Sequence, residues 1–325
     1  MSWKSAIDSL LEATVLASFT RVGYALRSRL FDWRPLTAYD LRGHTIVLTG
    51  ATSGIGLAAA RELAAMGATL ILVARDADKA ERLAHALDRV HAAGSVSFEV
   101  ADLADLEQVR SACERIARRH TRIDVLIHNA GALFNERRTT ADGTEASCQI
   151  MLVAPFLMTA LLHEPLRAAS PGRVLTMSSG GMYTAPLTVT GLEMPAADYS
   201  GVRQYARVKR AQVVLNELWA NRFPSADIVF HALHPGWVDT PGISGALPGF
   251  SRLLGPLLRT PQQGADTLAW LAADPVAARS SGRFWHDRAA RATHRLASTR
   301  ESDAAETRAA LWQWCVVRSG IDVAD

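Results

Sequence analysis

Two side chains four positions apart, Tyr205 and Lys209, have the types and the spacing that proton transfer requires. On a helix, residues i and i+4 lie on one face, so the phenol and the ammonium are neighbours. A free phenol has a pKa of about 10, and a nearby ammonium lowers it. Ser179, in the segment that closes a predicted strand, adds a hydroxyl that can hydrogen-bond a substrate oxygen. The trio predicts acid/base chemistry on a carbonyl/alcohol pair, whereas a surface helix pair would explain the Tyr–Lys spacing alone.

A glycine-rich turn after the first predicted strand indicates a phosphate site. Gly50, Gly54 and Gly56 separate the apolar residues 46–48 from an Ala-rich segment over 57–67 that reads as a helix. The N-terminus of such a helix presents unpaired N–H groups and a partial positive charge, which suit a pyrophosphate. The spacing is G-x-x-x-G-x-G rather than G-x-G-x-x-G. We therefore predict a dinucleotide site, with a plain strand–turn–helix as the alternative.

Three more strand ends extend this predicted cofactor site. Arg75 follows the second strand, where an acidic residue would hold the ribose 2′-OH of NAD. An arginine fork can instead pair with a 2′-phosphate, which predicts NADP(H) over NAD(H); a solvated arginine that begins a helix is the alternative. Asp102 and Leu103 follow the third strand, where they could cap the next helix or border an adenine. The small residues 129–131 follow the fourth and let a flat cofactor approach the backbone.

The elements that must position these residues alternate between strand and helix from residue 44 onward. Such alternation implies a parallel sheet with helices on both faces and a ligand site beyond the C-terminal strand ends. We predict an α/β fold with a Rossmann-type doubly wound parallel sheet, as one domain over residues 41–325 with a C-terminal helix. The expected strands are 46–48, 69–74, 95–100, 123–127, 173–177, 226–233 and 282–285, and the expected helices are 57–67, 76–91, 103–120, 145–168, 202–221 and 261–273.

The composition excludes several other classes of protein. The 325 residues carry a net charge of +3, from 35 Lys+Arg and 32 Asp+Glu, so the charge balance argues against a nucleic-acid binder. The ten histidines have no H-E-x-x-H spacing, so we expect no metal site. Cys113, Cys148 and Cys315 are odd in number and far apart, which fits a reducing compartment and predicts a cytoplasmic protein.

Residues 1–40 precede the first strand and form a predicted helical extension. Apolar residues from Trp3 to Phe19 recur at helical spacing, and Arg34-Pro35 ends the pattern. Charged residues interrupt the apolar character, so we expect neither a membrane span nor a signal peptide. The extension is expected to pack on the domain or on a partner subunit. The alternative is peripheral contact with a membrane surface.

Taken together and in this order, the motifs resemble the short-chain dehydrogenase/reductase family over about residues 40–290. The segments around Ser179 and Trp237 look most like the member-twelve branch of the vertebrate dehydrogenase/reductase proteins, which also has an N-terminal helical extension. The resemblance rests on Thr49-Gly50-x-x-x-Gly54-Ile55-Gly56, Asp102-Leu103, Asn129-Ala130-Gly131, Ser179, Tyr205-x-x-x-Lys209 and the segment from His234 to Thr240.

The resemblance implies NAD(P)-dependent hydride transfer. It implies that Tyr205 is the general acid/base, that Lys209 lowers the tyrosine pKa and binds ribose, that Ser179 orients the substrate, and that Thr240 contacts the nicotinamide carboxamide. It suggests a homodimer through helices 145–168 and 202–221. The full expected cofactor-binding set is Gly50, Thr52, Ser53, Gly54, Ile55, Gly56, Arg75, Asp102, Leu103, Asn129, Ala130, Gly131, Tyr205, Lys209, Pro235, Gly236, Val238 and Thr240.

Two positions depart from the family pattern. Met151 stands where the family commonly has an asparagine that supports a water chain from Lys209. Methionine cannot replace those hydrogen bonds, so an impaired proton relay is expected, and Met151→Asn is then expected to raise turnover. His128 stands where the family usually has another asparagine, and histidine can still form hydrogen bonds.

We interpret the chain as an NADP(H)-preferring oxidoreductase for an apolar carbonyl or alcohol. The alternative is a non-catalytic dinucleotide-binding or redox-sensing protein, in which Met151 marks lost chemistry. The presence of all three of Ser179, Tyr205 and Lys209 favours the enzyme. The residues that indicate an apolar substrate are Leu133, Phe134, Met182, Trp237 and the segment 243–254, which could form a lid or a helix pair packed on the core.

Overall fold

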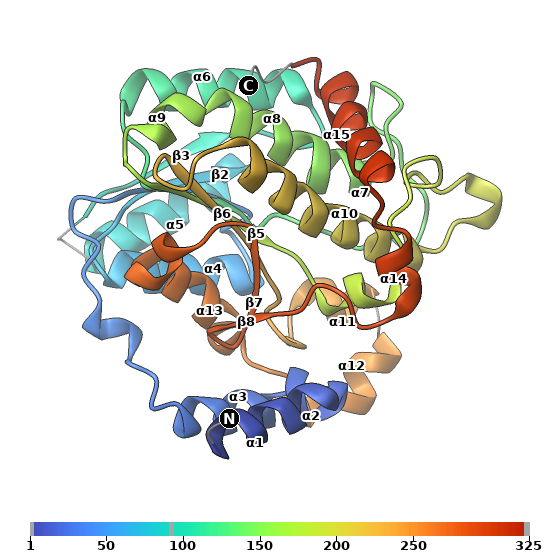
Figure 1. Cartoon of the computed structure of the whole chain (residues 1–325). Coiled ribbons are helices and arrows are strands. Elements are labelled where there is room, and N and C mark those ends of the chain that lie inside the picture. The colour runs from blue at the N-terminus through green and yellow to red at the C-terminus, as the bar shows by residue number, and fades with distance from the viewer. Residues whose placement is uncertain (1–2, 91–93, 247, 322–325) are drawn as a thin grey trace.

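One eight-stranded sheet forms the centre of the computed structural model, which describes residues 3–90, 94–246 and 248–321 (Figure 1). Its strands are β1 (Thr45–Thr49), β2 (Thr69–Ala74), β3 (Val96–Val100), β4 (Val125–His128), β5 (Gly172–Met177), β6 (Ile228–Leu233), β7 (Arg283–His286) and β8 (Ala289–Arg291). The order is β3-β2-β1-β4-β5-β6-β7-β8, parallel as far as β7 and antiparallel for β8. The doubly wound sheet is confirmed, and its order reverses between β1 and β4, where such sheets bind ligands.

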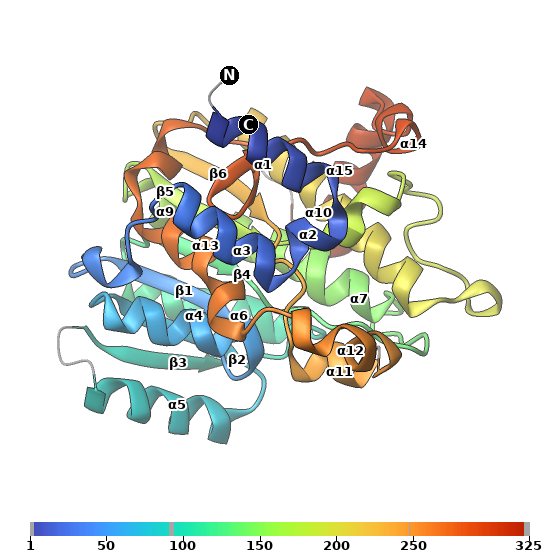
Figure 2. The same cartoon turned by 90° about the horizontal axis from the view of Figure 1, so that it is seen from below.

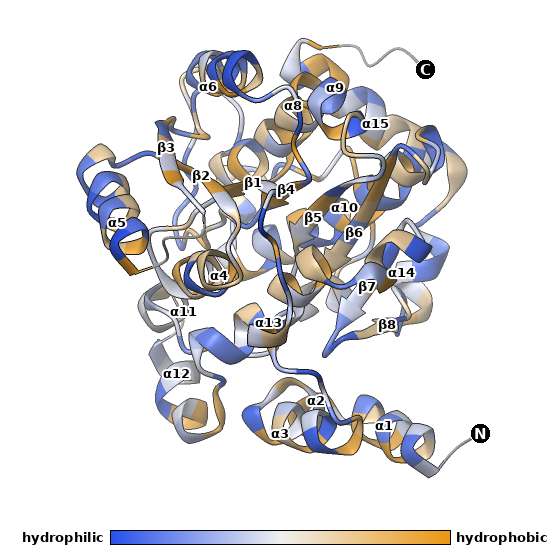
Figure 3. Cartoon of the chain, turned by 90° about the vertical axis from the view of Figure 1, so that its left-hand side faces the viewer, coloured by the Kyte–Doolittle hydropathy of each residue, from blue (hydrophilic) through white to orange (hydrophobic). Residues whose placement is uncertain are grey.

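Helices cover both faces of the sheet (Figure 3). Ile46 and Leu48 of β1 face α4, α5 and α13, whereas Val47 between them faces α6, α8 and α10, as alternation along a strand requires. The covering helices are α4 (Gly54–Ala65), α5 (Ala77–Val90), α6 (Leu106–Arg119), α7 (Ala146–Cys148), α8 (Ala154–Leu161), α9 (His163–Arg167), α10 (Gly201–Arg222) and α13 (Pro261–Ala273). The helix expected over 76–91 is present as α5, and the last residue of the expected range, His91, lies outside the described residues.

The helix expected over 145–168 is interrupted, because it contains two prolines. A π-helical turn, η2 (Gln149–Val153), separates α7 from α8. Pro155 has no N–H, so the α-helical bond to the carbonyl of Met151 four residues earlier cannot form. Pro165 lies in α9 after a break at Leu162. The prediction of one continuous helix was therefore wrong.

The N-terminal extension folds into three helices that form a layer beside α13 and the β7–β8 hairpin (Figures 1 and 2). They are α1 (Trp3–Ala13), α2 (Val15–Phe19) and α3 (Arg21–Leu30). Arg27 of α3 is fully buried and pairs with Asp8, Glu12 and Asp287 at 2.7, 2.9 and 2.8 Å. No helix among the described residues is long and apolar enough to span a membrane.

The C-terminal part adds two helices beyond β8, α14 (Ala297–Glu301) and α15 (Ala305–Ser319). In α15, Trp312 packs edge-on against Trp219 of α10 and Phe156 of α8, with ring centroids 4.8 and 4.9 Å apart. This helix therefore covers part of the faces of α8 and α10 that the sequence offered for a homodimer.

Candidate active site

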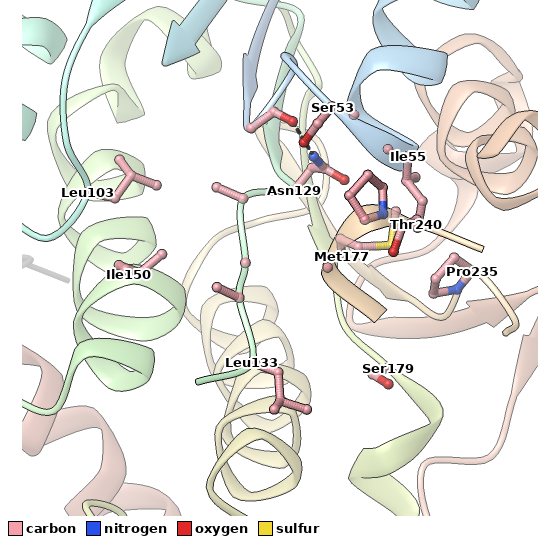
Figure 4. A pocket seen from close by; sticks show the side chains of 18 of the residues that line it. Ser53, Ile55, Leu103, Asn129, Leu133, Ile150, Met177, Ser179, Pro235 and Thr240 are labelled. Carbon is pink, nitrogen blue, oxygen red and sulfur yellow. Dashed lines mark hydrogen bonds between the residues drawn. The ribbon is translucent and has the colours of Figure 1, made fainter. Parts of the chain in front are cut away.

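A pocket of about 400 Å³ opens beyond the carboxyl ends of β1, β4 and β5 (Figure 4). It brings together the residues that the sequence predicts, from the glycine turn to the Tyr–Lys pair. Those lining it are Gly50, Thr52, Ser53, Gly54, Ile55, Gly56, Arg75, Asp102, Leu103, Asn129, Ala130, Gly131, Ser179, Tyr205, Lys209, Pro235, Gly236, Val238 and Thr240. One cavity thus holds both the expected cofactor groups and the expected reacting groups.

The glycine turn is a cradle in which side chains do not fit. A Cβ on Gly56 would lie 2.1 Å from the Gly50 carbonyl oxygen and 2.5 Å from Asn129 Nδ2. Gly50 has φ +69° and lies against the Ala130 backbone. Asn129 donates its side-chain N–H groups to the carbonyls of Thr49 and Gly50 at 3.1 and 3.2 Å, which ties the β1 and β4 ends together. The cradle leaves the α4 N-terminus open toward the pocket, so the residues present fit a dinucleotide pyrophosphate.

The edge of the cradle is basic and exposed. Arg75 directly follows β2, and its side chain has no hydrogen bond or ion pair with other described residues. It is therefore available to an anionic group in the pocket. Asp102 lines the pocket and accepts a hydrogen bond from the Ala104 N–H at 2.9 Å. Asp105, not Asp102, caps α6, because its side chain accepts from the N–H groups of Glu107 and Gln108; the helix-cap hypothesis for Asp102 was wrong.

The groups expected to react lie at the other end of the pocket. The Lys209 ammonium lies 5.2 Å from the centroid of the Tyr205 ring. Burial raises the pKa of Tyr205 to about 12, against the opposing effect of its hydrogen bond with Ser179. Burial also lowers the pKa of Lys209 to about 7. In the protein without ligand, desolvation of Tyr205 therefore outweighs the hydrogen bond with Ser179. The lowering of the tyrosine pKa by Lys209 stays a prediction.

Three residues that the sequence singled out lie away from this pocket's lining. Met182 is fully buried and belongs to the core between α10 and β7, so it does not contribute to an apolar substrate surface. His128 is buried and its Nε2 lies 2.9 Å from Thr159 Oγ1. Met151 is 1% exposed and its sulfur packs beneath Gly131. Leu133, Phe134 and Trp237 do line the pocket.

The 243–254 segment, expected to be a lid or a helix pair, contains two short helices, α11 (Pro241–Ala246) and α12 (Pro248–Leu254). Pro241 and Gly242 at the start of α11 line the pocket, so the segment borders its mouth. Other lining residues that the sequence analysis missed are Val73, Ala74, Ala101, Ala132, Ile150, Met177 and Ser178. All but Ile150 lie within two positions of predicted site residues at strand ends, so the strand ends themselves were the available signal. Ile150 lies in η2, where no predicted cofactor-binding or catalytic residue is adjacent.

A doubly wound sheet with a glycine cradle at one end of its pocket and a Ser–Tyr–Lys group at the other defines a dinucleotide-binding oxidoreductase architecture. The model of the short chain dehydrogenase family matches residues 44–246. The chain belongs to this family.

Similar proteins agree with this assignment. The human dehydrogenase/reductase SDR family member 12 is 37% identical over 90% of this chain and 91% of its own length. Human retinol dehydrogenase 13 is 30% identical over 86% of this chain and 85% of its own length. Among solved structures, L-sorbose reductase from Gluconobacter frateurii, complexed with NADPH and L-sorbose, is 22% identical with a TM-score of 0.60, over 76% of this chain and 95% of that chain. That likeness shows the shared fold.

Proposed function

We propose that the protein is an NADP(H)-preferring oxidoreductase that interconverts an apolar carbonyl compound and its alcohol. The observation that carries this proposal is that Ser179, Tyr205 and Lys209 line the same pocket as the glycine cradle and Arg75. Membership of the short chain dehydrogenase family supports a nicotinamide dinucleotide. The exposed Arg75 supports the form with a 2′-phosphate.

In this mechanism the bound cofactor supplies the hydride, and the chain supplies orientation and a proton. The α4 N-terminus and the cradle would hold the pyrophosphate, and Ser179 would donate a hydrogen bond to the substrate oxygen. Tyr205, with its pKa raised to about 12, stays protonated at neutral pH. It is therefore prepared to give its proton to that oxygen when the carbonyl is reduced.

The lining near the reacting groups supports an apolar substrate. Leu133, Phe134 and Trp237 contribute large apolar side chains to the pocket. Retinol dehydrogenase 13, a relative over most of this chain, is named for an apolar alcohol. We propose an aldehyde or ketone with an apolar body, because burial of that body supplies binding free energy.

The outer face of the N-terminal layer supports contact with a membrane surface. Trp3, Leu10 and Leu16 are 66%, 71% and 52% exposed, whereas the charged Arg27 is buried beneath them. The layer thus presents large apolar side chains to its surroundings, and the exposed Arg21 and Arg29 can meet lipid phosphates. We propose that this face lies on an anionic bilayer on the cytoplasmic side, where the three free, buried cysteines stay reduced.

Flotation with phosphatidylserine vesicles tests this contact. Leu10→Ser with Leu16→Ser should abolish flotation, and Val317→Ser, which removes an exposed apolar residue from α15, should leave it unchanged. Equal flotation of all three proteins would refute the membrane contact. The homodimer through the helices over 145–168 and 202–221 stays a proposal, which light scattering after gel filtration tests.

The experiment for the enzymatic proposal is titration with NADPH and NADH, followed by turnover against a panel of apolar aldehydes, ketones and quinones. We expect tighter binding of NADPH and oxidation by at least one carbonyl. Tyr205→Phe should bind NADPH normally and lose turnover by about 10³-fold. Tight NADPH binding without turnover on any carbonyl would instead favour the non-catalytic, redox-sensing alternative.

A further inference from the structure

Lys209 is a buried cation held by neutral groups. It is 2% exposed, and its Nζ donates to the Met177 carbonyl at 2.8 Å and to Gln212 Oε1 at 2.9 Å. Among the described residues, no carboxylate forms an ion pair with it. An ammonium has three N–H groups, so the third is left for the pocket side, where Tyr205 lies.

The Gln212 amide is fixed at both of its ends. Its Nε2 donates to the Met151 carbonyl at 2.8 Å, while its Oε1 accepts from Lys209. Reversing the amide would place N–H groups against the ammonium and oxygen against the carbonyl, so only one orientation satisfies both neighbours. The Met151 carbonyl is the one that loses its α-helical partner because Pro155 has no N–H.

We propose that Gln212 is a positioning residue, which bridges the Lys209 ammonium to the Met151 carbonyl and so keeps the third N–H directed at Tyr205 and the pocket. The inference rests on the proposed function for the role of Lys209, but the bridge itself is a property of the chain without ligand. It makes the side chain at position 151 unimportant for holding Lys209, because the backbone carbonyl is the group in use.

The surroundings of Lys209 make Gln212 decisive for its charge. On α10 the titratable neighbour is Tyr205, and β4 contributes His128, which lines a small cavity shared with Gln212. From β5 comes the Met177 carbonyl, and from η2 the Met151 carbonyl, reached through the amide. A hydrogen bond to a charged group is strong in a dry site, so removal of the amide oxygen favours neutral lysine.

The chain contains three lysines, Lys4, Lys79 and Lys209, which makes the test direct. Protein with ¹³C-labelled lysine, free of cofactor and substrate, is titrated by NMR, with Lys4 and Lys79 as internal references. In Gln212→Leu we expect the Lys209 midpoint to fall by about one pH unit. In Gln212→Glu we expect it to rise by at least that much, because the acceptor becomes an anion.

Asn216→Leu is the matched control, since Asn216 is a buried amide one turn further along α10 that donates to the Arg283 carbonyl at 3.5 Å and, in the described part of the chain, forms no hydrogen bond with Lys209. It should leave the midpoint unchanged. A Lys209 midpoint that stays at the wild-type value in Gln212→Glu, the variant that retains an acceptor at this position, overturns the proposal, as does an equal shift in Asn216→Leu. With a carbonyl substrate, kcat should fall about tenfold in Gln212→Leu and less than twofold in Asn216→Leu. Because the titration needs no turnover, failure of the enzymatic proposal would be seen separately.

Discussion

Two buried cations in this molecule have opposite surroundings: neutral acceptors contact one, and carboxylates contact the other. Lys209, beneath the pocket, is surrounded by a carbonyl, an amide and a phenol ring, and burial lowers its pKa to about 7. Arg27, beneath the N-terminal helices, touches three carboxylates. Burial acts against its charge too, but Asp287 and Asp8 together raise its pKa.

The second cluster continues through another arginine. Arg259 is 1% exposed, pairs with Asp287 at 2.6 Å and donates to the carbonyls of Ser18, Phe19 and Thr20. Burial alone would raise the pKa of Asp287, yet His286 and the arginines hold it well below its usual range. The N-terminal layer is thus attached to the β7–β8 hairpin by charges that stay ionised.

The difference indicates what each cluster is for. Neutralising a cation that is paired with carboxylates costs much free energy, so such a cation stays charged and holds the surrounding structure in place. A cation held by neutral acceptors stays close to its titration point and responds to a ligand or a proton nearby. The contrast predicts that substitution of Lys209 lowers turnover with little change in stability, and that substitution of Arg27 lowers stability with little change in turnover.

Removal of the Lys209 ammonium should lower turnover strongly and leave the free energy of unfolding almost unchanged. In Lys209→Met we expect kcat/KM to fall by about 10³-fold, or about 4 kcal/mol, because Tyr205 and the cofactor ribose lose their cationic neighbour. The free energy of unfolding should change by less than about 1 kcal/mol, because relief from desolvation offsets two lost hydrogen bonds. Turnover assays and urea unfolding measure both. A loss of stability equal to that of Arg27→Met would contradict the contrast.

Removal of Arg27 should do the reverse. Arg27→Met removes the one cation that contacts all three of Asp8, Glu12 and Asp287, and we expect unfolding to become easier by about 3 kcal/mol. Turnover at 25 °C should stay within about threefold, because Arg27 does not line the pocket. Arg42→Met, which breaks an exposed 2.6 Å pair with Asp40, is the control and should not measurably change stability. An equal free energy of unfolding in Arg27→Met and Arg42→Met would show that the ion pairs of Arg27 do not hold the N-terminal helices in place.

Acid should lower the stability of the fold at a higher pH than the one at which it protonates the carboxylates around Arg27. Burial lowers the pKa of His128 to about 3 and of His231 to about 4, so both are neutral in the fold. Below about pH 6.5 these histidines bind protons in the unfolded chain but not in the folded chain. The free energy of unfolding therefore decreases by about 1.4 kcal/mol for each histidine and each unit by which the pH is lowered. Urea midpoints between pH 8 and 5 measure this slope. His128→Asn should make it shallower, and an unchanged slope would mean that His128 is protonated in the fold.

Arg75 is an exposed cation and can be compared with the two buried ones. Arg75 has neither burial nor an ion pair among the described residues, so its replacement should affect only what enters the pocket. In Arg75→Asp we expect the ratio of NADPH to NADH affinity to fall by about tenfold, with unchanged unfolding. Fluorescence titration of both cofactors measures the ratio. A ratio that stays at the wild-type value would show that another residue recognises the 2′-phosphate.

The sequence predicted the pocket better than the charged layer, and the reason is locality. The glycine cradle, Arg75 and the Tyr205/Lys209 pair lie at ends of strands and helices, so periodicity and spacing within short windows place them. Arg27 meets Asp287 across 260 positions, and no local pattern marks that pair. The exposure of Trp3, Leu10 and Leu16 was likewise hidden, since a helical pattern does not say which face is covered.

The break after α7 had a local signal that the sequence analysis did not use. Pro155 lies inside the expected helix, and a proline there removes one bond and frees one carbonyl. Gln212 lies three residues after Lys209, hence on the same face of α10. Together these could have predicted a bridge between the two helices, although its closure to Met151 depends on how α10 and η2 pack.

The smallest expected effect separates the two accounts of position 151. If Lys209 needs an asparagine side chain there, Met151→Asn should raise turnover. If the amide of Gln212 already joins Lys209 to the Met151 carbonyl, the side chain is irrelevant to the relay, and kcat should stay within about twofold, less than 0.5 kcal/mol. Met151→Leu, which keeps the apolar packing beneath Gly131, is the control for packing alone. A several-fold rise in kcat in Met151→Asn but not in Met151→Leu would favour the impaired relay, because only the asparagine adds a new hydrogen-bonding group.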